Sequence, residues 1–260
     1  MKRVGKLYDK IVSVENLKLA DIKARKGKLQ QYGVIKHDSN KEENILRLQK
    51  SLIDETFVTS EYSVFTINDP KQREIYKLPY YPDRIVQWAI LLQTEPTFMS
   101  TFTIDTYSCI KRRGIHKALS NVKLALKDDS MKYCLKLDIQ KFYPSINHDI
   151  LRFLLKKKFK DIRLLKLFDR IILSSKGCPI GNLLSQWFAN FYLCYFDHYI
   201  KEILKVKYFF RYCDDMILLG QTKEELWLLL SKIRRYLWNN LKLKLRSNFQ
   251  VFSIVRRGID

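Results

Sequence analysis

The sequence predicts an α+β protein with a hydrophobic core. Hydrophobic residues make up 47% of the 260 residues, and 8 glycines and 6 prolines are too few for a fibrous or disordered chain. Segments of helical and of strand periodicity follow one another without strict alternation, which favours the α+β class. The sequence contains no internal repeat and no flexible linker, so nothing in it marks two independently folding domains.

Each element is predicted from its local pattern. Residues 1–55 are predicted to be helical, and residues 56–80 have the β-branched, aromatic, Asn, Asp and Pro content of strands and turns. A strand is predicted over 133–139, because apolar residues at odd positions alternate there with other residues at even positions. The other predicted elements are helices from Pro82 onward, over 149–170, from 182 to about 205 and over 222–238, and strands over 208–213, 216–219 and 241–255.

The charge balance predicts a polyanionic partner. The chain has 48 Lys and Arg against 27 Asp and Glu, a net charge of +21 at pH 7. This much positive charge repels itself in a compact fold unless a polyanion neutralises it, so nucleic acid is the first candidate partner and an anionic membrane the second. The segment 149–170 is especially basic, although such a run is also typical of a solvated helix face.

No targeting or membrane segment is expected. No apolar stretch follows the basic N-terminus and no long uncharged apolar span occurs, which argues against a secretory signal and a membrane helix. The five cysteines are scattered and never form a C-x-x-C pair, as expected for free thiols in a reducing cytosol. These observations predict a cytoplasmic protein.

Three carboxylates carry the clearest chemical signal. Asp138 lies near the end of a predicted strand, and Asp214 and Asp215 lie at the tip of a predicted hairpin. Nucleotidyl transfer requires that a triphosphate be neutralised and a hydroxyl activated, and two Mg2+ ions held by a few carboxylates do both. An Asp-Asp pair also suits a tight turn, so the tetrapeptide Tyr212–Asp215 alone leaves both interpretations open.

The sequence around these acids resembles the reverse transcriptases. Their motifs occur in the family's order and spacing from about Asn16 to Asp260. The matching segments are Leu137–Ile146 (motif A), Gly177–Asn190 (motif B), Tyr212–Asp215 (the Y-x-D-D of motif C), Lys71–Ile75 and Asp83–Gln87 (fingers motifs of bacterial group II-like members), and Asn16–Lys28 (their N-terminal segment).

The resemblance implies a right-hand polymerase core that acts as an RNA-directed DNA polymerase. The fingers are expected over residues 1–131, with 147–176 at the junction with the palm, and the palm is expected over 132–260. A thumb is expected to be missing from this chain. The implied cofactor is a pair of Mg2+ ions, with Mn2+ as an alternative. By the same resemblance Asp138, Asp214 and Asp215 are the catalytic metal ligands, and the carbonyl of Ile139 is a further ligand.

The resemblance also implies a nucleotide pocket. Lys71 and Arg73 match residues that bind the triphosphate, and Ile180 and Gly181 belong to the nucleotide-binding part of motif B. Tyr143 matches the family's steric gate, an aromatic ring that excludes a 2′-hydroxyl. The alternative for Tyr143 is ordinary packing of one aromatic ring against the next.

Motif B departs from the common family pattern at two positions. Ile180 stands where Gln is usual, and Gln186 follows Ser185 where Pro is usual. The variant I-G-x-x-x-S-Q is similar to the signature of reverse transcriptases of diversity-generating retroelements, which copy a template RNA with frequent errors at adenines. The alternatives are a retron-type or group II maturase-like enzyme, an RNA-dependent RNA polymerase, and a truncated non-catalytic RNA-binding protein.

The implied partners follow from this assignment. They are a template RNA, its RNA–DNA hybrid, deoxynucleotides and a small basic accessory variability protein in a bacterial or phage system, with no membrane partner. The residues expected to bind RNA are Arg84, Lys156, Lys157 and Lys158.

Overall fold

The computed structural model describes residues 3–68 and 72–258, which form two compact units. Unit 1 comprises Met1–Ser100 and His148–Gln186, and unit 2 comprises Thr101–Asn147 and Trp187–Asp260. Neither unit is continuous in sequence, because each is built from two separate stretches of the chain. No helix among the described residues is both long and apolar enough to span a bilayer.

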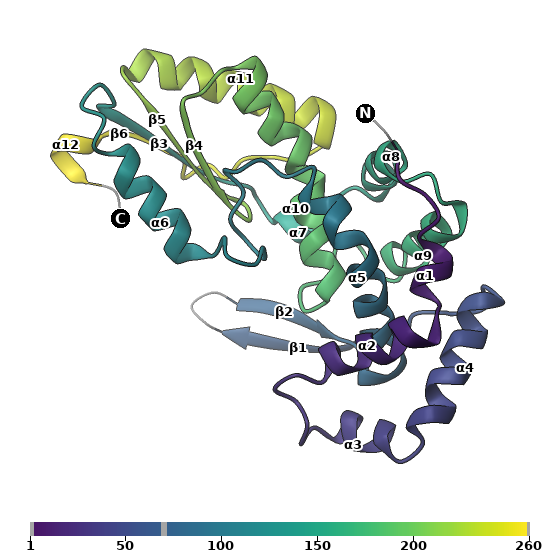
Figure 1. Ribbon diagram of the computed structural model, residues 1–260. Helices are drawn as coiled ribbons and strands as arrows, with labels where there is room; N and C mark the ends of the chain where they lie inside the picture. The colour runs from purple at the N-terminus through teal and green to yellow at the C-terminus, as the bar shows by residue number, and fades with distance from the viewer. Residues whose placement is uncertain (1–2, 69–71, 259–260) are drawn as a thin grey trace. The chain divides into compact units, whose positions relative to one another are not determined.

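Unit 1 is mainly helical and carries one β-hairpin (Figure 1). Its core is formed where α5 packs against α2, since nearly every turn of α5 buries apolar side chains. The elements are α1 (Tyr8–Ile11), α2 (Val14–Ala24), α3 (Tyr32–Asp38), α4 (Lys41–Ile53), β1 (Ser63–Asn68), β2 (Gln72–Lys77), η1 (Tyr80–Arg84), α5 (Ile85–Met99), α8 (His148–Lys158), α9 (Ile162–Ile172) and the first turn of α10 (Leu183–His198).

The hairpin of unit 1 is a two-stranded antiparallel sheet. Its register runs from Ser63 opposite Lys77 to Asn68 opposite Gln72, and most of its side chains are exposed. A two-stranded hairpin has little stability of its own, so it needs an anchor. The backbone N–H of Tyr76 provides one by donating to the carbonyl of Ile180 at 2.7 Å.

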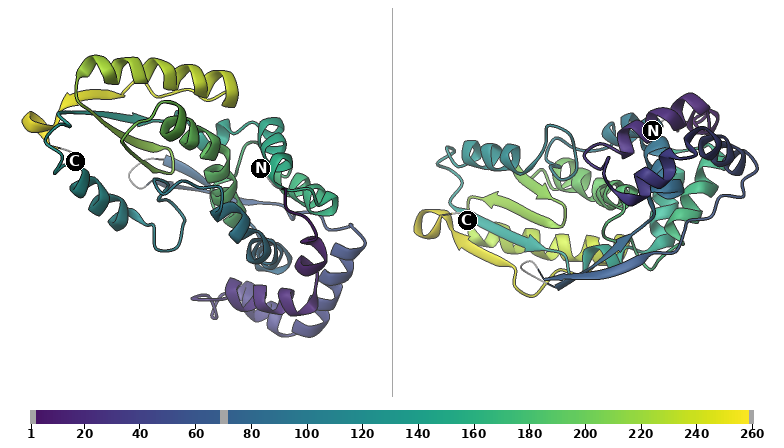
Figure 2. Two further views of the ribbon diagram at one scale, coloured as in Figure 1. Left: turned by 45° about the horizontal axis from the view of Figure 1, so that its top comes forward. Right: turned by 90° about the horizontal axis from the view of Figure 1, so that it is seen from below.

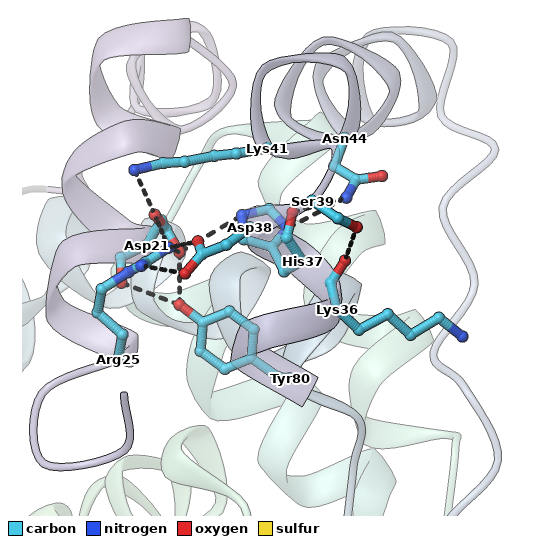
Figure 3. A network of polar contacts seen from close by, with 9 residues as sticks. All are labelled: Asp21, Arg25, Lys36, His37, Asp38, Ser39, Lys41, Asn44 and Tyr80. Carbon is cyan, nitrogen blue, oxygen red and sulfur yellow. Dashed lines mark hydrogen bonds and ion pairs between the residues drawn. The ribbon is translucent and has the colours of Figure 1, made fainter. Parts of the chain in front are cut away.

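A buried carboxylate joins the helices of unit 1 to η1 (Figure 3). Asp21 is fully buried, accepts a short hydrogen bond from the hydroxyl of Tyr80, and pairs with Arg25 at 2.7 Å and Lys41 at 3.3 Å. Burial alone would raise the pKa of Asp21, but the hydrogen bonds from Tyr80 and Arg25 outweigh it and lower the pKa. The charged carboxylate therefore fixes α2 to the start of η1.

Unit 2 is built around a four-stranded antiparallel sheet in the order β4-β5-β3-β6. Helices α6 and α11 lie on opposite faces of this sheet (Figures 1 and 2). The elements are α6 (Ile115–Ala125), β3 (Tyr133–Asp138), α7 (Phe142–Ser145), the remainder of α10, η2 (Tyr199–Ile203), β4 (Tyr208–Tyr212), β5 (Asp215–Gly220), α11 (Lys223–Leu241), β6 (Gln250–Ser253) and α12 (Ile254–Arg257).

The alternation in β3 explains why helices cover both faces. Cys134 and Leu219 are paired neighbours on one face and pack against buried residues of α6. Leu135 and Leu218 point to the other face, where α11 packs against β3, β5 and β6. The predicted strand over 133–139 and the hairpin around Asp214 are confirmed.

Some predicted elements differ from the structure. The basic segment 149–170 forms two helices, because the side chain of Asp161 accepts the backbone N–H of Leu164 and caps the start of α9. In the predicted strand over 241–255, only Gln250–Ser253 forms a regular strand. The compact units also divide the chain differently from 1–131 and 132–260: residues 101–131 belong to unit 2, where α6 packs on β4, and residues 148–186 belong to unit 1.

A fully buried ion pair joins α10 to the strand that leads into the acidic hairpin. Arg211 donates to both carboxylate oxygens of Asp197, at 2.7 Å and 2.5 Å, and neither side chain has any exposed surface. The same guanidinium donates to Asn190 at 3.1 Å and to the carbonyl of Cys213 at 2.9 Å. Thr106 donates to Asp197 at 2.9 Å. All the buried charge is thus hydrogen-bonded, which a buried pair requires.

We expect Arg211→Met to destabilise the protein by about 3–5 kcal/mol, because it leaves the carboxylate of Asp197 buried without its partner. The double variant Arg211→Met/Asp197→Leu should recover most of this loss, since it removes both charges. Urea unfolding of the three proteins measures the difference. If the single and double variants have the same free energy of unfolding, the loss of stability comes from altered side-chain packing and not from the unpaired charge of Asp197.

Candidate functional site

The acidic hairpin lies at one end of the sheet of unit 2. Strands β4 and β5 are joined by the two-residue loop Cys213–Asp214, with Tyr212 opposite Asp215. Asp215 is also opposite Asp138 on the neighbouring strand β3. Because directly opposite residues project to the same face, Asp138 and Asp215 share one face of the sheet.

This face is covered by α6 at one end and left open at the other. Asp138 lies four residues after Cys134, and Asp215 four residues before Leu219, so both acids share the face against which α6 packs. Cys134 and Leu219 are buried, whereas Asp138 is half-buried and Asp215 exposed. The acids therefore occupy the solvent-accessible end of a face whose other end is core.

The hairpin loop is held in an uncommon backbone conformation. Cys213 has φ 58°, a region that residues with a Cβ rarely adopt, and its carbonyl accepts from the buried Arg211. Its thiol donates to the hydroxyl of Tyr143 at 3.6 Å. Burial is the main cause that raises the pKa of both the Cys213 thiol, to about 12, and the Tyr143 hydroxyl. Both groups therefore stay neutral beside Asp214.

Negative charge is concentrated at this loop. The pKa of Asp214 is raised mainly by burial, and repulsion from Asp215 and Asp138 adds to the shift. Arg246 partly balances this charge: its Nε lies 3.0 Å from a carboxylate oxygen of Asp138, and its backbone N–H donates to the Asp138 carbonyl at 2.8 Å. A cation placed among the three acids would relieve the repulsion.

The donor set fits a hard divalent cation. Among residues 3–68 and 72–258, no group of three or more His, Cys, Asp or Glu side chains is arranged so that it could hold a metal ion by itself. Mg2+ does not need one, because it keeps several waters and binds one or two carboxylates together with phosphate oxygens. Asp138, Asp214 and Asp215 supply such carboxylates. Ile139 is buried directly after Asp138 and pairs with Leu245 in an isolated bridge.

Tyr143 lies beside the acids in the same unit. It belongs to α7, which begins after Lys141 in a left-handed conformation with φ 47°. Its ring packs edge-on against Phe142 with centroids 5.5 Å apart, and its hydroxyl contacts Cys213. The structure therefore shows the aromatic packing that was the simpler alternative, and it also places the ring next to the Asp214 loop.

A basic pocket of about 200 Å³ lies within unit 1. No acidic residue lines it, and its three cations, Lys28, Lys77 and Arg84, form no ion pair with any described residue. Burial lowers the pKa of Lys28, and the positive charges of Arg84 and Lys77 lower it further. Its other lining residues are Gln31, Phe65, Ile75, Tyr76, Leu78, Gln87, Gly181, Asn182 and Leu183. This uncompensated positive charge favours an anion.

The motif B segment forms one wall of the pocket. Gly181 has φ 114°, and a Cβ there would lie 2.6 Å from the carbonyl oxygen of Tyr76, so only glycine fits. The side-chain oxygen of Gln87 accepts the backbone N–H of Leu183 at 3.0 Å, and its nitrogen donates to Asn182 at 3.1 Å. Gln87 thus holds the start of α10 against α5.

The remaining predicted site residues lie in varied environments. Arg73 is exposed on β2, whereas Lys71 lies outside the described residues. Ile180 is half-buried, Ser185 is buried and Gln186 is exposed. Lys156 and Lys157 are exposed on α8, but Lys158 is only 7% exposed. Lys158 is thus the least accessible of the three lysines, and its expected role in RNA binding stays a prediction.

Sequence reasoning missed several residues of these sites. Arg211 and Asp197 are single charges within otherwise apolar segments, and that isolation was a readable signal of a buried pair. Lys28, Lys77 and Arg246 have no comparable signal, because basic residues are frequent throughout a chain of net charge +21.

Comparisons with known proteins agree with this geometry. The family model for reverse transcriptase (RNA-dependent DNA polymerase) matches residues 68–248. The chain is 28% identical over 139 residues to protein YkfC of Escherichia coli K12, covering 48% of the chain and 36% of YkfC. It is 25% identical over 185 residues to the group II intron-encoded protein LtrA of Lactococcus lactis subsp. cremoris, covering 66% of the chain and 30% of LtrA. The chain thus spans about a third of these relatives' length.

Two solved telomerase structures share the fold. The apo telomerase of Candida tropicalis, truncated from its C-terminal domain, superposes with a TM-score of 0.55 at 11% identity, covering 76% of this chain and 50% of that one. The telomerase of Candida albicans, in complex with a TWJ fragment of telomeric RNA, superposes with a TM-score of 0.51 at 9% identity. This match covers 78% of this chain and 44% of the telomerase chain. At these identities the likeness concerns the fold alone, and it confirms the predicted α+β reverse transcriptase fold.

The sequence motifs, the paired strands that carry the acids and the family match all concern the same region. The match over residues 68–248 covers well over half of the chain and includes Asp138, Asp214 and Asp215. The chain therefore belongs to the reverse transcriptase family.

Proposed function

We propose that this chain is an RNA-directed DNA polymerase that copies a template RNA into cDNA. The observation that carries the proposal is the placement of Asp138 and Asp215 at the uncovered end of one face of the sheet, next to the Asp214 loop. In this proposal unit 1 corresponds to the fingers and unit 2 to the palm.

The three acids act as ligands of two divalent cations, for which Mg2+ is the natural choice. When bound, such ions neutralise the triphosphate and lower the pKa of the attacking hydroxyl. Asp138 and Asp214 hold the ions, Asp215 completes the acidic cluster, and Ile139 contributes its carbonyl. Arg246 balances the charge of Asp138, and Arg211 keeps the loop that carries Asp214 in place.

Tyr143 acts as the steric gate under the sugar of the incoming nucleotide. Its ring is fixed by Phe142 and by the Cys213 thiol, and a rigid ring discriminates between hydroxyl and hydrogen better than a mobile one. Lys71 and Arg73 bind the triphosphate, for which Arg offers paired hydrogen bonds and Lys a point charge.

The basic pocket of unit 1 binds a backbone phosphate of the template RNA. Lys28, Lys77 and Arg84 supply the positive charge that attracts the phosphate group. The volume of about 200 Å³ is below the roughly 300–1,000 Å³ of sites that enclose whole small molecules, so it suits one phosphate group. The exposed Lys156 and Lys157 add to the RNA-binding charge.

The finer assignment is the error-prone enzyme of a diversity-generating retroelement, which works with a small basic accessory protein. It is supported by Ile180 and Gln186 in motif B. A group II-like reverse transcriptase is the second candidate, supported by the similarity to the group II intron-encoded protein LtrA.

We expect Asp214→Asn to abolish primer extension on an RNA template while leaving RNA affinity within about two-fold of the wild type, because the carboxylate stabilises charge only during phosphoryl transfer. The same variant should raise the melting temperature by roughly 2–4 °C, equivalent to about 1 kcal/mol, since it removes a half-buried like charge. Extension within a few-fold of the wild type would show that Asp214 is a turn residue and that the two-metal assignment is wrong.

We expect Lys28→Gln/Arg84→Gln to lose RNA affinity and keep its catalytic rate, the reverse of the effect expected for Asp214→Asn. Losing two phosphate-binding cations should weaken template binding and reduce the slope of log affinity against log salt by about 0.7 per lost contact, with kcat little changed. Fluorescence anisotropy over a salt series measures the slope. The matched control Lys36→Gln/Lys50→Gln removes two exposed lysines away from the pocket. An equal slope for both double variants would show that the pocket does not bind the template.

We expect Ile180→Gln to reduce misincorporation opposite template adenine more than opposite the other bases. Gln restores a hydrogen bond worth about 0.5–1.5 kcal/mol, which corresponds to roughly a two- to ten-fold change in selection. Deep sequencing of cDNA made by both proteins from one RNA, with the accessory protein present, measures the error spectrum. A wild type that is accurate at adenine would contradict the retroelement assignment and favour the group II-like alternative.

A further inference from the structure

A stripe of aromatic and basic residues covers the outer face of α11. Trp227, Ser231, Arg234 and Trp238 are spaced by four, three and four residues, so they follow one another along a single face of the helix. Trp227 is 50% exposed and Trp238 is 48% exposed, although large aromatic side chains are usually covered. Their spacing corresponds to about 16 Å along the helix.

The segment that follows α11 adds rings and cations to this stripe. Phe249 packs edge-on against Trp227 with centroids 5.9 Å apart, and the Arg234 guanidinium lies 4.5 Å from the centre of the Phe249 ring. Lys242 and Lys244 lie 5.8 Å and 5.1 Å from the Trp238 ring. Three cation–ring pairs thus fall within residues 234–249. We call this set of six residues the α11 stripe: Trp227, Arg234, Trp238, Lys242, Lys244 and Phe249.

Among the described residues, no acidic side chain pairs with the cations of the α11 stripe, although Glu224 and Glu225 are exposed at the start of the helix. Arg234, Lys242 and Lys244 form no ion pair with a described residue, and Lys232 and Arg235 are exposed on the same helix. The buried side of α11 packs on the sheet face opposite to the one that bears Asp138 and Asp215. The two tryptophans therefore lie on the side of the sheet away from the acidic site, and polymerisation as proposed above does not use them. Lys244, in contrast, borders that site, because its carbonyl accepts the backbone N–H of Gln140 at 2.8 Å.

We propose that the α11 stripe binds a single-stranded segment of RNA. Exposed aromatic faces stack on unpaired bases, and the cations beside them neutralise phosphates, a combination typical of proteins that bind single strands. A duplex hides its base faces, so it cannot stack in this way. A protein partner fits less well, because the centres of protein interfaces are depleted in lysine, whereas lysines lie against the Trp238 ring here.

The choice of RNA rests on the proposed function, which makes a template RNA the polyanion that the protein holds. A strand that spans the two tryptophans covers several nucleotides, within the range of known single-strand sites. The stripe then serves as a second attachment point that keeps a long RNA on the protein while its other part is copied. Its base contacts are stacking contacts, so little sequence preference is expected.

The test is the affinity of the full chain for a fluorescein-labelled oligouridine of 12 nucleotides, measured by anisotropy. We expect Trp227→Leu/Trp238→Leu to weaken binding at least ten-fold, because each stacked base contributes about 1–3 kcal/mol. Lys242→Gln/Lys244→Gln should reduce the salt slope by about 1.4, from 0.7 per phosphate. All four positions are solvent-exposed, and circular dichroism melting curves verify that the variants fold.

Two control variants match the chemistry elsewhere on the chain. Tyr32→Leu removes an aromatic side chain that is 78% exposed in unit 1, and Lys36→Gln/Lys50→Gln removes two exposed lysines. An affinity of the tryptophan variant equal to that of Tyr32→Leu would overturn the proposal. An equal loss for a 12-base-pair RNA duplex would also overturn it, because stacking requires unpaired bases.

Primer extension on a short primed template separates this inference from the proposed function. We expect the tryptophan variant to extend such a template at the wild-type rate, since the stripe does not hold the reacting strands. If the wild type fails to extend but the stripe variants still lose oligouridine binding, the polymerase proposal fails and the single-strand site stands.

Discussion

The acidic hairpin of unit 2 depends on the buried pair of Arg211 and Asp197. A two-residue loop with Cys213 at φ 58° is not a conformation that the chain adopts without support. Arg211 fixes the Cys213 carbonyl, and Asp197 makes it possible for that guanidinium to be buried. The carboxylates of Asp214 and Asp215 are thereby held close together against their own repulsion. The free energy that this repulsion costs the folded state is offset by the Arg211–Asp197 ion pair in the core.

Unit 1 also combines a buried, paired charge with accessible charges that have no partner among the described residues. Asp21 is buried and fully paired, and it fixes α2 to the start of η1. Lys28 follows α2 and Arg84 ends η1, so this structural pair positions two of the cations that line the basic pocket. In both units the buried charges with partners shape the fold, and the partly exposed charges without counter-ions mark the places where a ligand of opposite sign lowers the free energy.

Much of the fold was predictable, because it follows from local patterns. The alternation over 133–139 and the apolar runs on either side of Asp214 specify two strands and a hairpin without reference to the rest of the chain. The grouping of the chain into two discontinuous units was not predictable, since it depends on the packing of α6 against the sheet face that carries Cys134. The acids were predictable from motif spacing, whereas Arg246 was not, because its contact with Asp138 joins segments that are far apart in sequence.

The net charge of +21 predicted a polyanion but not where it binds. The described residues place unbalanced cations in two different environments, a pocket of unit 1 with amides and no acids, and an exposed aromatic helix face in unit 2. A pocket that fits one phosphate provides little beyond charge, so its contribution to affinity should fall steeply with salt. Stacking on the tryptophans is far less salt-dependent. If both sites hold the same RNA, raising the salt concentration releases the phosphate from the pocket while the α11 stripe retains part of its contact with the strand.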